Sequence, residues 1–316
     1  MTHKVFCSIV IPVYNSSETL LEITDRVDKQ FKKIKKSYEL IFVDDFSTVP
    51  ETHEALNKIA QQKINVSVFH LAKNFGQHNA LMCGLQRCSG EYVVTMDDDL
   101  QHSPDDIPGM IDYLNENDLD LVIGRYDKKK HHLFRNLGSR LNILLTTRDL
   151  NIPRDLALTS FKVFRSYLLE HLLEFKQANP SIDYLLLHVT SRVGNCLIEH
   201  FARESGKSGY TIRKLVKRLA DNVWNHSYWP LKVVSVMGIV FSVVSFFSGS
   251  YYLVRYLSGK ITVSGFTTIV LLITFFSGCI LISLGIIGEY LIRLVQSTFK
   301  NPQFIVREEK KHSGRK

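Results

Sequence analysis

Two long stretches without a charged residue constrain this chain more than any other feature. The first is Val233–Val254 and the second is Ile261–Gly288, with only Arg255–Lys260 between them. A helix rises about 1.5 Å per residue, so about 20 apolar residues span the hydrocarbon core of a bilayer. Each stretch is long enough, and the pattern predicts two transmembrane helices that form a hairpin. The alternative, two helices buried in a soluble core, is disfavoured because such helices rarely stay free of charge for so long.

Basic residues flank the outer ends of this hairpin far more than its inner loop. They are Arg213, Lys214, Lys217, Arg218 and Lys232 before it, and Arg293, Lys300, Arg307, Lys310 and Lys311 after it. The inner loop has only Arg255 and Lys260. Because cytoplasmic loops carry an excess of Lys and Arg, we expect a multi-pass protein of the inner (plasma) membrane. The N-terminal half and both termini are then cytoplasmic.

The segment Thr211–Trp224, just before the hairpin, has the pattern of an amphipathic helix. Its apolar residues Ile212, Leu215, Leu219 and Val223 fall on one helical face. The pattern suits a helix in the headgroup layer, and it also suits a surface helix packed on a soluble domain. The net charge of +8 is compatible with nucleic acid, anionic lipid or an anionic substrate. Because the basic residues gather beside the apolar segments and no nucleic-acid-binding signature is present, we expect membrane lipid and no nucleic acid.

The cysteines and the N-terminus indicate the compartment. The five cysteines are scattered and lack the spacing of metal ligands. We therefore expect free thiols in a reducing compartment. The N-terminus runs directly into a strand pattern, so we expect no cleavable signal peptide.

The N-terminal half alternates short apolar runs with helical stretches. The runs are Val5–Pro12, Tyr38–Val43, Val66–Leu71, Glu91–Met96 and Leu119–Ile123. Helices are expected near Glu18–Lys36, capped by Ser16 or Ser17, and near Gly76–Cys88. Buried strands that alternate with helices predict an α/β fold with a parallel sheet covered on both faces. In such sheets ligands bind beyond the carboxyl ends of the strands, where the polar clusters at 14–15, 44–45, 97–101 and 125 fall.

The most distinctive of these clusters is Asp97-Asp98-Asp99-Leu100-Gln101. Three adjacent carboxylates repel one another, and at the end of a buried strand a cation is expected to neutralise them. Mg²⁺ or Mn²⁺ prefers oxygen ligands and also bridges diphosphates. Since alternate residues of an extended segment point the same way, Asp97, Asp99 and Gln101 can converge on one ion. A solvated acidic turn is the simpler alternative.

At these residues the chain resembles the family 2 polyprenyl-phosphate glycosyltransferases. This family includes dolichyl-phosphate mannose synthase, bactoprenol glucosyltransferases and the undecaprenyl-phosphate aminoarabinose transferase of lipid A modification. The matching segments, in the family's order, are Ile11–Asn15, Phe42–Asp45, Asn74–Gln77, Thr95–His102, His200–Tyr210, and Leu284–Tyr290 with Arg293 and Asn301–Pro302. The chain departs from the family's pattern at Asp98, where Ala is usual, and at Phe46, where Gly is usual.

The resemblance implies a role for each matching residue. The nucleoside would contact Pro12, Tyr14, Asn15, Asp44 and Asp45, with Gln77 and Asp97 also at the substrate. The resemblance further implies that Asp97, Asp99 and Gln101 hold Mg²⁺ or Mn²⁺ on the diphosphate, and that Asp99 or Asp98 orients the acceptor. The acceptor phosphate would contact Arg125, Arg135, Ser139 and Arg203. Arginine suits this task because its planar fork binds phosphate through two hydrogen bonds.

The same resemblance implies the domain organisation. Residues 1–210 form a GT-A domain, which is a Rossmann-like α/β domain with a mostly parallel sheet. Residues 211–230 form the amphipathic interfacial helix. Two transmembrane helices, about 233–254 and 265–288, lie within 231–292, and a basic cytoplasmic tail covers 293–316. The chain is also compatible with a homo-oligomer.

The expected reaction is transfer of a sugar from a nucleotide-sugar to polyprenyl (undecaprenyl) phosphate, with inversion. The product would donate its sugar to a cell-envelope glycan or to lipopolysaccharide. A phosphate monoester is largely ionised at neutral pH, so this acceptor needs a strong general base less than a sugar hydroxyl does. Two alternatives are a glycosyltransferase that elongates a glycan at a hydroxyl and a non-catalytic membrane scaffold. The Gln-x-x-Arg-Trp motif of processive enzymes is absent from the sequence.

Overall fold

The computed structural model describes residues 5–126, 156–175, 180–198, 265–298 and 302–311, with isolated positions between 236 and 258. The chain divides into two compact units. One consists of Met1–Tyr210 together with Asn301–Lys316, and the other is Thr211–Lys300. The chain therefore leaves the first unit and later returns to it.

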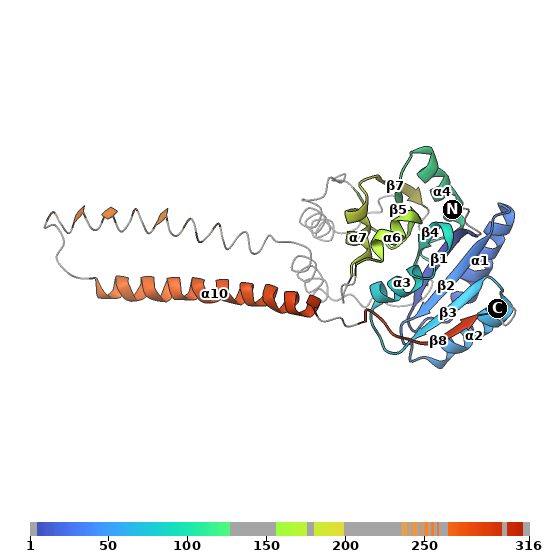
Figure 1. Ribbon diagram of the computed structural model, residues 1–316, viewed down its shortest axis with the longest axis horizontal. Helices are drawn as coiled ribbons and strands as arrows, with labels where there is room; N and C mark the ends of the chain where they lie inside the picture. Colours follow the sequence, from blue (N-terminus) through green and yellow to red (C-terminus); the bar gives the residue numbers. More distant parts are fainter. Residues whose placement is uncertain are drawn as a thin grey trace. The chain divides into compact units, whose positions relative to one another are not determined.

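An eight-stranded sheet is the frame of the first unit (Figure 1). Its strands are β1 Val5–Val13, β2 Tyr38–Asp44, β3 Val66–Leu71, β4 Gly90–Thr95, β5 Leu121–Tyr126, β6 Lys162–Arg165, β7 Val193–Ile198 and β8 Val306–Lys311. Their order across the sheet is β7-β5-β6-β4-β1-β2-β3-β8. The four central strands, β4, β1, β2 and β3, run parallel, whereas β6 and β8 run antiparallel to their neighbours. The sheet is thus mostly parallel, as the sequence predicts.

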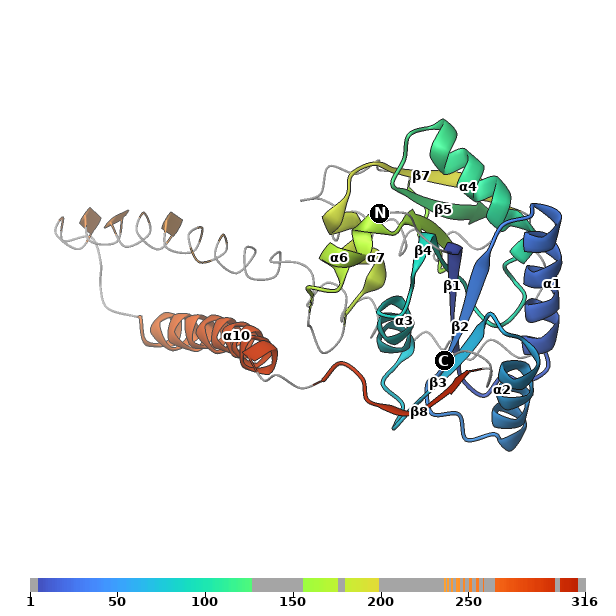
Figure 2. The same ribbon diagram turned by 45° about the vertical axis from the view of Figure 1, so that its right-hand side comes forward.

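Helices cover both faces of this sheet (Figures 1 and 2). They are α1 Leu20–Lys33, α2 Pro50–Gln62, α3 Gln77–Leu85, the 3-10 helix η1 Pro104–Asp106, α4 Ile107–Glu116, α6 Tyr167–Leu172 and α7 Ile182–Val189. Helices α1, α2 and α4 pack in one apolar cluster with alternate residues of β1 and β2. Helices α3, α6 and α7 pack in a second cluster with the residues of β1 and β2 that alternate with those of the first cluster. Each central strand is buried on both faces, which explains its continuous apolar sequence.

Helix α3 approaches the sheet closely because Gly84 has no side chain. A Cβ atom at this position would lie 2.3 Å from Cγ1 of Val10 in β1 and 3.2 Å from Cγ2 of Val43 in β2. The close approach fixes the start of α3 over the carboxyl ends of these strands.

The five predicted strands are confirmed to within three residues at each end. The predicted cap of the first helix is wrong. Thr19, and not Ser16 or Ser17, is the residue before α1, and its side chain makes no capping hydrogen bond. The Thr19 hydroxyl instead donates to the backbone carbonyl of Asp98. A contact with a distant loop thus replaces the local cap.

Strand β8 is a feature that the sequence analysis does not anticipate. It lies within 293–316, which we expected to be a basic tail, and it pairs with β3 so that Glu308 is opposite His70. Only Val306 in this strand is apolar, and its charged side chains are mostly exposed. Charged residues are typical of an edge strand, where they prevent pairing with other chains, and they hide the strand pattern in the sequence.

The described part of the second unit is mainly one long helix, α10, which covers Phe266–Thr298. It has 33 residues and is therefore about 50 Å long. Within the described residues, no helix combines the length and the hydropathy needed to cross a membrane. The predicted segment 211–230 and most of 233–254 lie outside the described residues.

Candidate functional site

The carboxyl ends of β1, β2 and β4 bring most of the candidate residues to one edge of the sheet. Residues 14–15 follow β1, residues 44–45 end β2, and residues 97–101 follow β4. Because β4, β1 and β2 are parallel neighbours, these ends lie side by side. Arg125 is near the end of β5, which runs antiparallel to β6 and hence parallel to β4. This edge is where an α/β sheet binds its ligands.

Asp44 at the end of β2 is fully buried, and protein groups occupy both of its oxygens. Its Oδ1 accepts the backbone N–H of Ser47 at 2.9 Å, and its Oδ2 lies 2.8 Å from Nδ1 of His70. Burial acts to raise the pKa of Asp44, but the hydrogen bonds from His70 and Ser47 outweigh it and the pKa is lowered. Asp44 is thus an ionised carboxylate that holds the turn after β2.

Asp45 binds the start of helix α3. Its carboxylate accepts the backbone N–H groups of Phe75 at 2.7 Å and Gly76 at 2.8 Å. Gly76 has φ +90°, a conformation that side chains rarely adopt, and it immediately precedes α3. Burial raises the pKa of Asp45, and the charge of Asp44 adds to this, although the two backbone hydrogen bonds oppose it. The Asn74–Gln77 motif therefore has a structural reason, since its backbone is the ligand of Asp45.

The loop after β1 is tied to the turn after β2 through Asn15. The side-chain oxygen of Asn15 accepts the N–H groups of Thr48 at 2.8 Å and Val49 at 3.3 Å. The N–H of Asn15 donates to the hydroxyl of Ser47 at 2.9 Å. Pro12 is buried in β1 opposite Val43, and Tyr14 is 52% exposed. Of these predicted nucleoside contacts, Tyr14 and Asn15 are exposed, Pro12 is buried, and Asn15 also holds the loop that presents Tyr14.

Asp97, the first residue of the acidic triplet, is held from two directions. Its Oδ1 accepts the side-chain N–H of Gln77, the first residue of α3, at 2.8 Å. Its Oδ2 accepts the hydroxyl of Ser160, which precedes β6. The structure thus brings together the predicted Asp97 and Gln77, and it adds Ser160. Both contacts restrict the orientation of a half-exposed carboxylate and leave lone pairs on each oxygen.

Three carboxylates gather at the end of β4 and act on one another electrostatically. Burial raises the pKa of Asp98 to about 7, and the charges of Asp97 and Asp99 contribute to the rise. The backbone N–H of Tyr14 donates to the Asp98 carboxylate and opposes the shift. Asp99 accepts the N–H of Gln101 at 3.2 Å. The shift of Asp98 is the electrostatic sign of an acidic cluster that a cation would relieve.

These residues fit a magnesium or manganese ion bound together with a diphosphate. Mg²⁺ is usually held by one or two carboxylates, with substrate phosphates and water completing its shell. The side-chain acceptor atoms of Asp97, Asp99 and Gln101 are all oxygens, and all three residues are half-buried at a strand end. Three protein ligands do not complete the shell of such an ion, so positions remain for the phosphates.

The predicted acceptor residues are less well covered. Arg125 is half-buried in β5, opposite Leu197 of β7. Arg135, Ser139 and Arg203 lie outside the described residues. Of the four residues predicted to bind the acceptor phosphate, the structure therefore describes only Arg125.

Sequence reasoning missed Ser160, His53 and His70. Ser160 belongs to a segment, Leu158–Lys162, that matches the family only loosely. His70 gave a signal that could have been used, since a histidine in a continuous apolar run is a buried polar group that needs a partner. His53 on α2 gave none, because only the fold brings it to within 3.7 Å of Asp44.

Comparisons with known proteins agree with this geometry. The chain is similar to the undecaprenyl-phosphate 4-deoxy-4-formamido-L-arabinose transferase of Proteus mirabilis, at 28% identity over 95% of this chain and 93% of that protein. The enzyme of the same name from Photorhabdus laumondii is also 28% identical over the same shares. Both similarities extend through the charge-free segments.

Solved structures show the same fold. Glucosyl-3-phosphoglycerate synthase of Mycobacterium tuberculosis, in complex with Mn²⁺, UDP-glucose and phosphoglyceric acid, superposes with a TM-score of 0.51 at 18% identity. The superposition covers 70% of this chain and 78% of that protein. The model of the family described as "Glycosyl transferase family 2" matches residues 8–173, just over half of the chain. Together with the GT-A-like sheet and its acidic edge, this match shows that the chain belongs to glycosyl transferase family 2, the nucleotide-sugar glycosyltransferases.

Proposed function

We propose that this glycosyltransferase moves its sugar onto a polyprenyl phosphate at the cytoplasmic face of a membrane. One observation carries the proposal. The family model ends at residue 173, whereas the similarity to the undecaprenyl-phosphate transferases continues over 95% of the chain. The C-terminal part, with its apolar segments, is therefore shared with enzymes named for a lipid acceptor. An enzyme that acts on a soluble acceptor has no need of that part.

At the donor side, Asp97, Asp99 and Gln101 would hold Mg²⁺ or Mn²⁺. When bound, the ion would stabilise the negative charge of the departing nucleoside diphosphate. The residues of the chain supply position and orientation. Gln77 and Ser160 fix the Asp97 carboxylate. Exposed Tyr14 offers a ring to the nucleobase, and Asp44 and Asp45, which also fix the neighbouring loops, complete the proposed nucleoside site with Pro12 and Asn15.

At the acceptor side, the lipid phosphate attacks the anomeric carbon in one displacement. A new C–O bond forms as the bond to the nucleoside diphosphate breaks, so the configuration inverts. The phosphate is already largely anionic at neutral pH, and no proton has to be removed. Asp98 or Asp99 orients the acceptor, and Arg125, Arg135, Ser139 and Arg203 bind its phosphate. Arginine contacts of this kind position the nucleophile and offset its charge next to the acidic triplet.

The return of the chain into the sheet supports a hairpin in the membrane. Strand β8 pairs with β3 after α10 has ended, so the chain before and after the second unit belongs to one body. A membrane segment inserted there must cross an even number of times. Helix α10 exposes large apolar side chains along its length, among them Ile269, Phe275, Ile282 and Leu291. Exposed apolar side chains of this density are typical of a lipid-facing helix.

The full-length protein in detergent tests the proposal directly. Each of a panel of labelled nucleotide-sugars is incubated with undecaprenyl phosphate and Mn²⁺, and label is measured in the organic phase. We expect one donor to give a labelled lipid whose formation stops with EDTA. Release of nucleoside diphosphate without labelled lipid, or transfer only to a soluble glycan hydroxyl, would overturn the lipid acceptor while leaving the glycosyltransferase assignment intact.

A further inference from the structure

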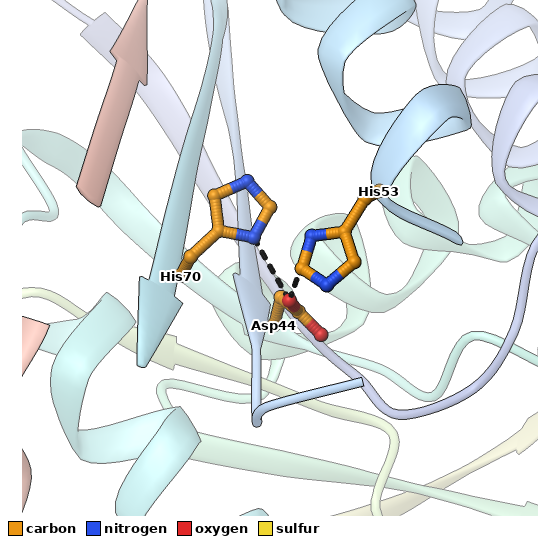
Figure 3. A group of neighbouring side chains, drawn as sticks. All are labelled: Asp44, His53 and His70. Carbon is orange, nitrogen blue, oxygen red and sulfur yellow. Dashed lines mark hydrogen bonds and ion pairs between the residues drawn. The ribbon is translucent and has the colours of Figure 1, made fainter. Parts of the chain in front are cut away.

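A second polar cluster lies at the end of β2, on the side that faces β3 and β8. It consists of Asp44 at the end of β2, His53 in the first turns of α2 and His70 near the end of β3 (Figure 3). One ligand atom from each residue lies within 4.8 Å of the other two, and among the described residues no other such group is found. Both imidazole rings direct Nδ1 toward the same carboxylate oxygen, Oδ2 of Asp44, at 2.8 Å from His70 and 3.7 Å from His53.

The hydrogen bond of His53 determines what its inner nitrogen can do. Nε2 of His53 lies 3.0 Å from the backbone carbonyl of Ser47, which can only accept. Nε2 must therefore carry the hydrogen, and in a neutral ring Nδ1 then presents a lone pair. That lone pair faces the ionised carboxylate of Asp44. A metal ion placed between these two acceptors would be stabilised by both.

The surroundings favour the metal ion. Histidines that bind metals usually donate their other ring N–H to a backbone carbonyl or a carboxylate, as His53 does. For zinc, with metal–ligand bonds of about 2.0–2.2 Å in tetrahedral geometry, neighbouring ligand atoms lie about 3.3–3.5 Å apart. The two observed distances, 2.8 and 3.7 Å, lie on either side of this separation. The ligand atoms of all three residues lie within 4.8 Å of one another. His70 would bind the ion through Nδ1 in place of its hydrogen bond to Asp44, with its hydrogen then on Nε2.

The three side chains also leave room for a further ligand. All of them line one cavity of about 480 Å³, whose wall includes Ser47 and, from β8, Arg307 and Glu308. An ion bound by three protein ligands keeps a fourth position, which water can fill from this cavity. None of the acidic triplet at the end of β4 lines the cavity. The two clusters are therefore chemically separate.

We propose that Asp44, His53 and His70 bind a divalent transition-metal ion of the zinc class at a site distinct from the donor diphosphate. Two imidazoles and one carboxylate suit Zn²⁺, whereas Mg²⁺ and Mn²⁺ prefer oxygen ligands. The ion links the turn after β2 to β3 and α2. That turn holds Asn15 through Thr48 and Val49, so the ion also stabilises the loop that carries Tyr14. This inference does not depend on the identity of the acceptor.

Zn²⁺ binding to the full-length protein tests the site. The chelator-treated protein is titrated with Zn²⁺ against a zinc indicator, alongside His53→Ala and the matched control His171→Ala, which removes an exposed histidine far from the cluster in sequence. His53 is the better choice for substitution because its side chain is 43% exposed, whereas His70 is buried. We expect wild type and His171→Ala to bind the ion equally, and His53→Ala to bind it at least about 10-fold more weakly.

The Co²⁺-substituted protein gives a second readout. Tetrahedral Co²⁺ absorbs strongly in the visible range, and we expect this absorption in wild type and in Asp97→Asn but not in His53→Ala. Equal zinc affinity in His53→Ala and wild type would overturn the proposal. So would the absence of tight Zn²⁺ binding in wild type.

Discussion

The ends of β2 and β4 both carry adjacent aspartates, yet the protein surrounds the two sets in different ways. At the end of β2, Asp44 and Asp45 are buried and accept hydrogen bonds from His70, Ser47, Phe75 and Gly76. At the end of β4, Asp97, Asp98 and Asp99 are only half-buried, and mutual repulsion contributes to the raised pKa of Asp98. The first set holds backbone in place, while the second keeps negative charge available.

The difference teaches that adjacent carboxylates in a sequence do not by themselves mark a catalytic site. The two ends differ in the burial of their carboxylates and in what those carboxylates hold. At the end of β2, Ser47 in the following turn, and Phe75 and Gly76 between β3 and α3, present N–H groups to buried aspartates. Asp97 receives two side-chain hydrogen bonds, from Gln77 and Ser160, and these orient it without satisfying its remaining lone pairs. A cation and a diphosphate are the natural partners of this second set.

The largest expected effect comes from removing a carboxylate at the end of β4. Asp99→Ala should reduce sugar transfer by at least about 100-fold, the loss expected when a charge-stabilising group is removed. The protein should stay folded and in the membrane, because Asp99 is not a core residue. Steady-state transfer rates with saturating Mn²⁺ or Mg²⁺, together with a thermal unfolding curve, check both parts. Near-wild-type turnover would remove Asp99 from the metal site.

The second prediction concerns two arginines that we propose bind the phosphate of the acceptor. Arg135→Ala and Arg203→Ala each remove a charge-assisted contact to phosphate, which contributes about 1.5–3 kcal/mol, or about 10- to 150-fold. We expect the loss in the kinetic parameters for polyprenyl phosphate, with little change in those for the nucleotide-sugar. Varying each substrate separately measures this. A loss of donor affinity with normal acceptor dependence would move these arginines to the donor site.

The third variant tests the structural role of the end of β2. Asp45→Ala leaves the half-buried N–H groups of Phe75 and Gly76 without their acceptor and should lower the free energy of unfolding by about 1–3 kcal/mol. Asp45→Asn is the matched control, because its amide oxygen can still accept one of the two bonds, so its loss should be smaller. Thermal unfolding of the full-length protein measures both. Unchanged stability in Asp45→Ala would contradict the assignment.

The smallest effect concerns pH. The pKa of Asp44 is lowered in the folded state, so its ionised form stabilises the fold at pH values above its unfolded pKa of about 3.9. This contribution is lost as pH falls through the lower folded pKa. Asp44→Asn should therefore be less stable than wild type at neutral pH, and the difference should shrink in acid. Unfolding measured from pH 7 down to pH 3 checks the sign, and a difference that grows in acid would refute it.

The sequence predicts the frame of the catalytic unit well because its central strands are buried on both faces. Val5–Val13 and Tyr38–Asp44 are predominantly apolar runs, and such runs keep their structure in most contexts. Strand β6 is short, β8 is charged, and β7 has a mixed polar and apolar sequence, and the pairing of all three depends on distant parts of the chain. Val306–Lys311 shows this most clearly, since an edge strand does not need an apolar pattern.

The candidate site is predicted from the sequence only in part, because motifs give the positions of residues but not their contacts. Asp97 and Gln77 follow from motifs, and the structure places them in contact. The role of Asn15 does not follow, because the motif gives its position and not its three partners in the next turn. The His53–Asp44–His70 cluster arises only when α2 and β3 pack beside β2, which no local pattern encodes.

Manganese binding measured by electron paramagnetic resonance tests most directly the central claim, that the end of β4 and not the end of β2 holds the catalytic metal. Full-length wild type, Asp99→Ala and Asp45→Asn are each titrated with Mn²⁺ in the presence and absence of UDP. The account predicts Mn²⁺ binding that UDP strengthens in wild type and in Asp45→Asn and that is lost in Asp99→Ala. UDP-dependent binding that survives in Asp99→Ala but is lost in Asp45→Asn would contradict it.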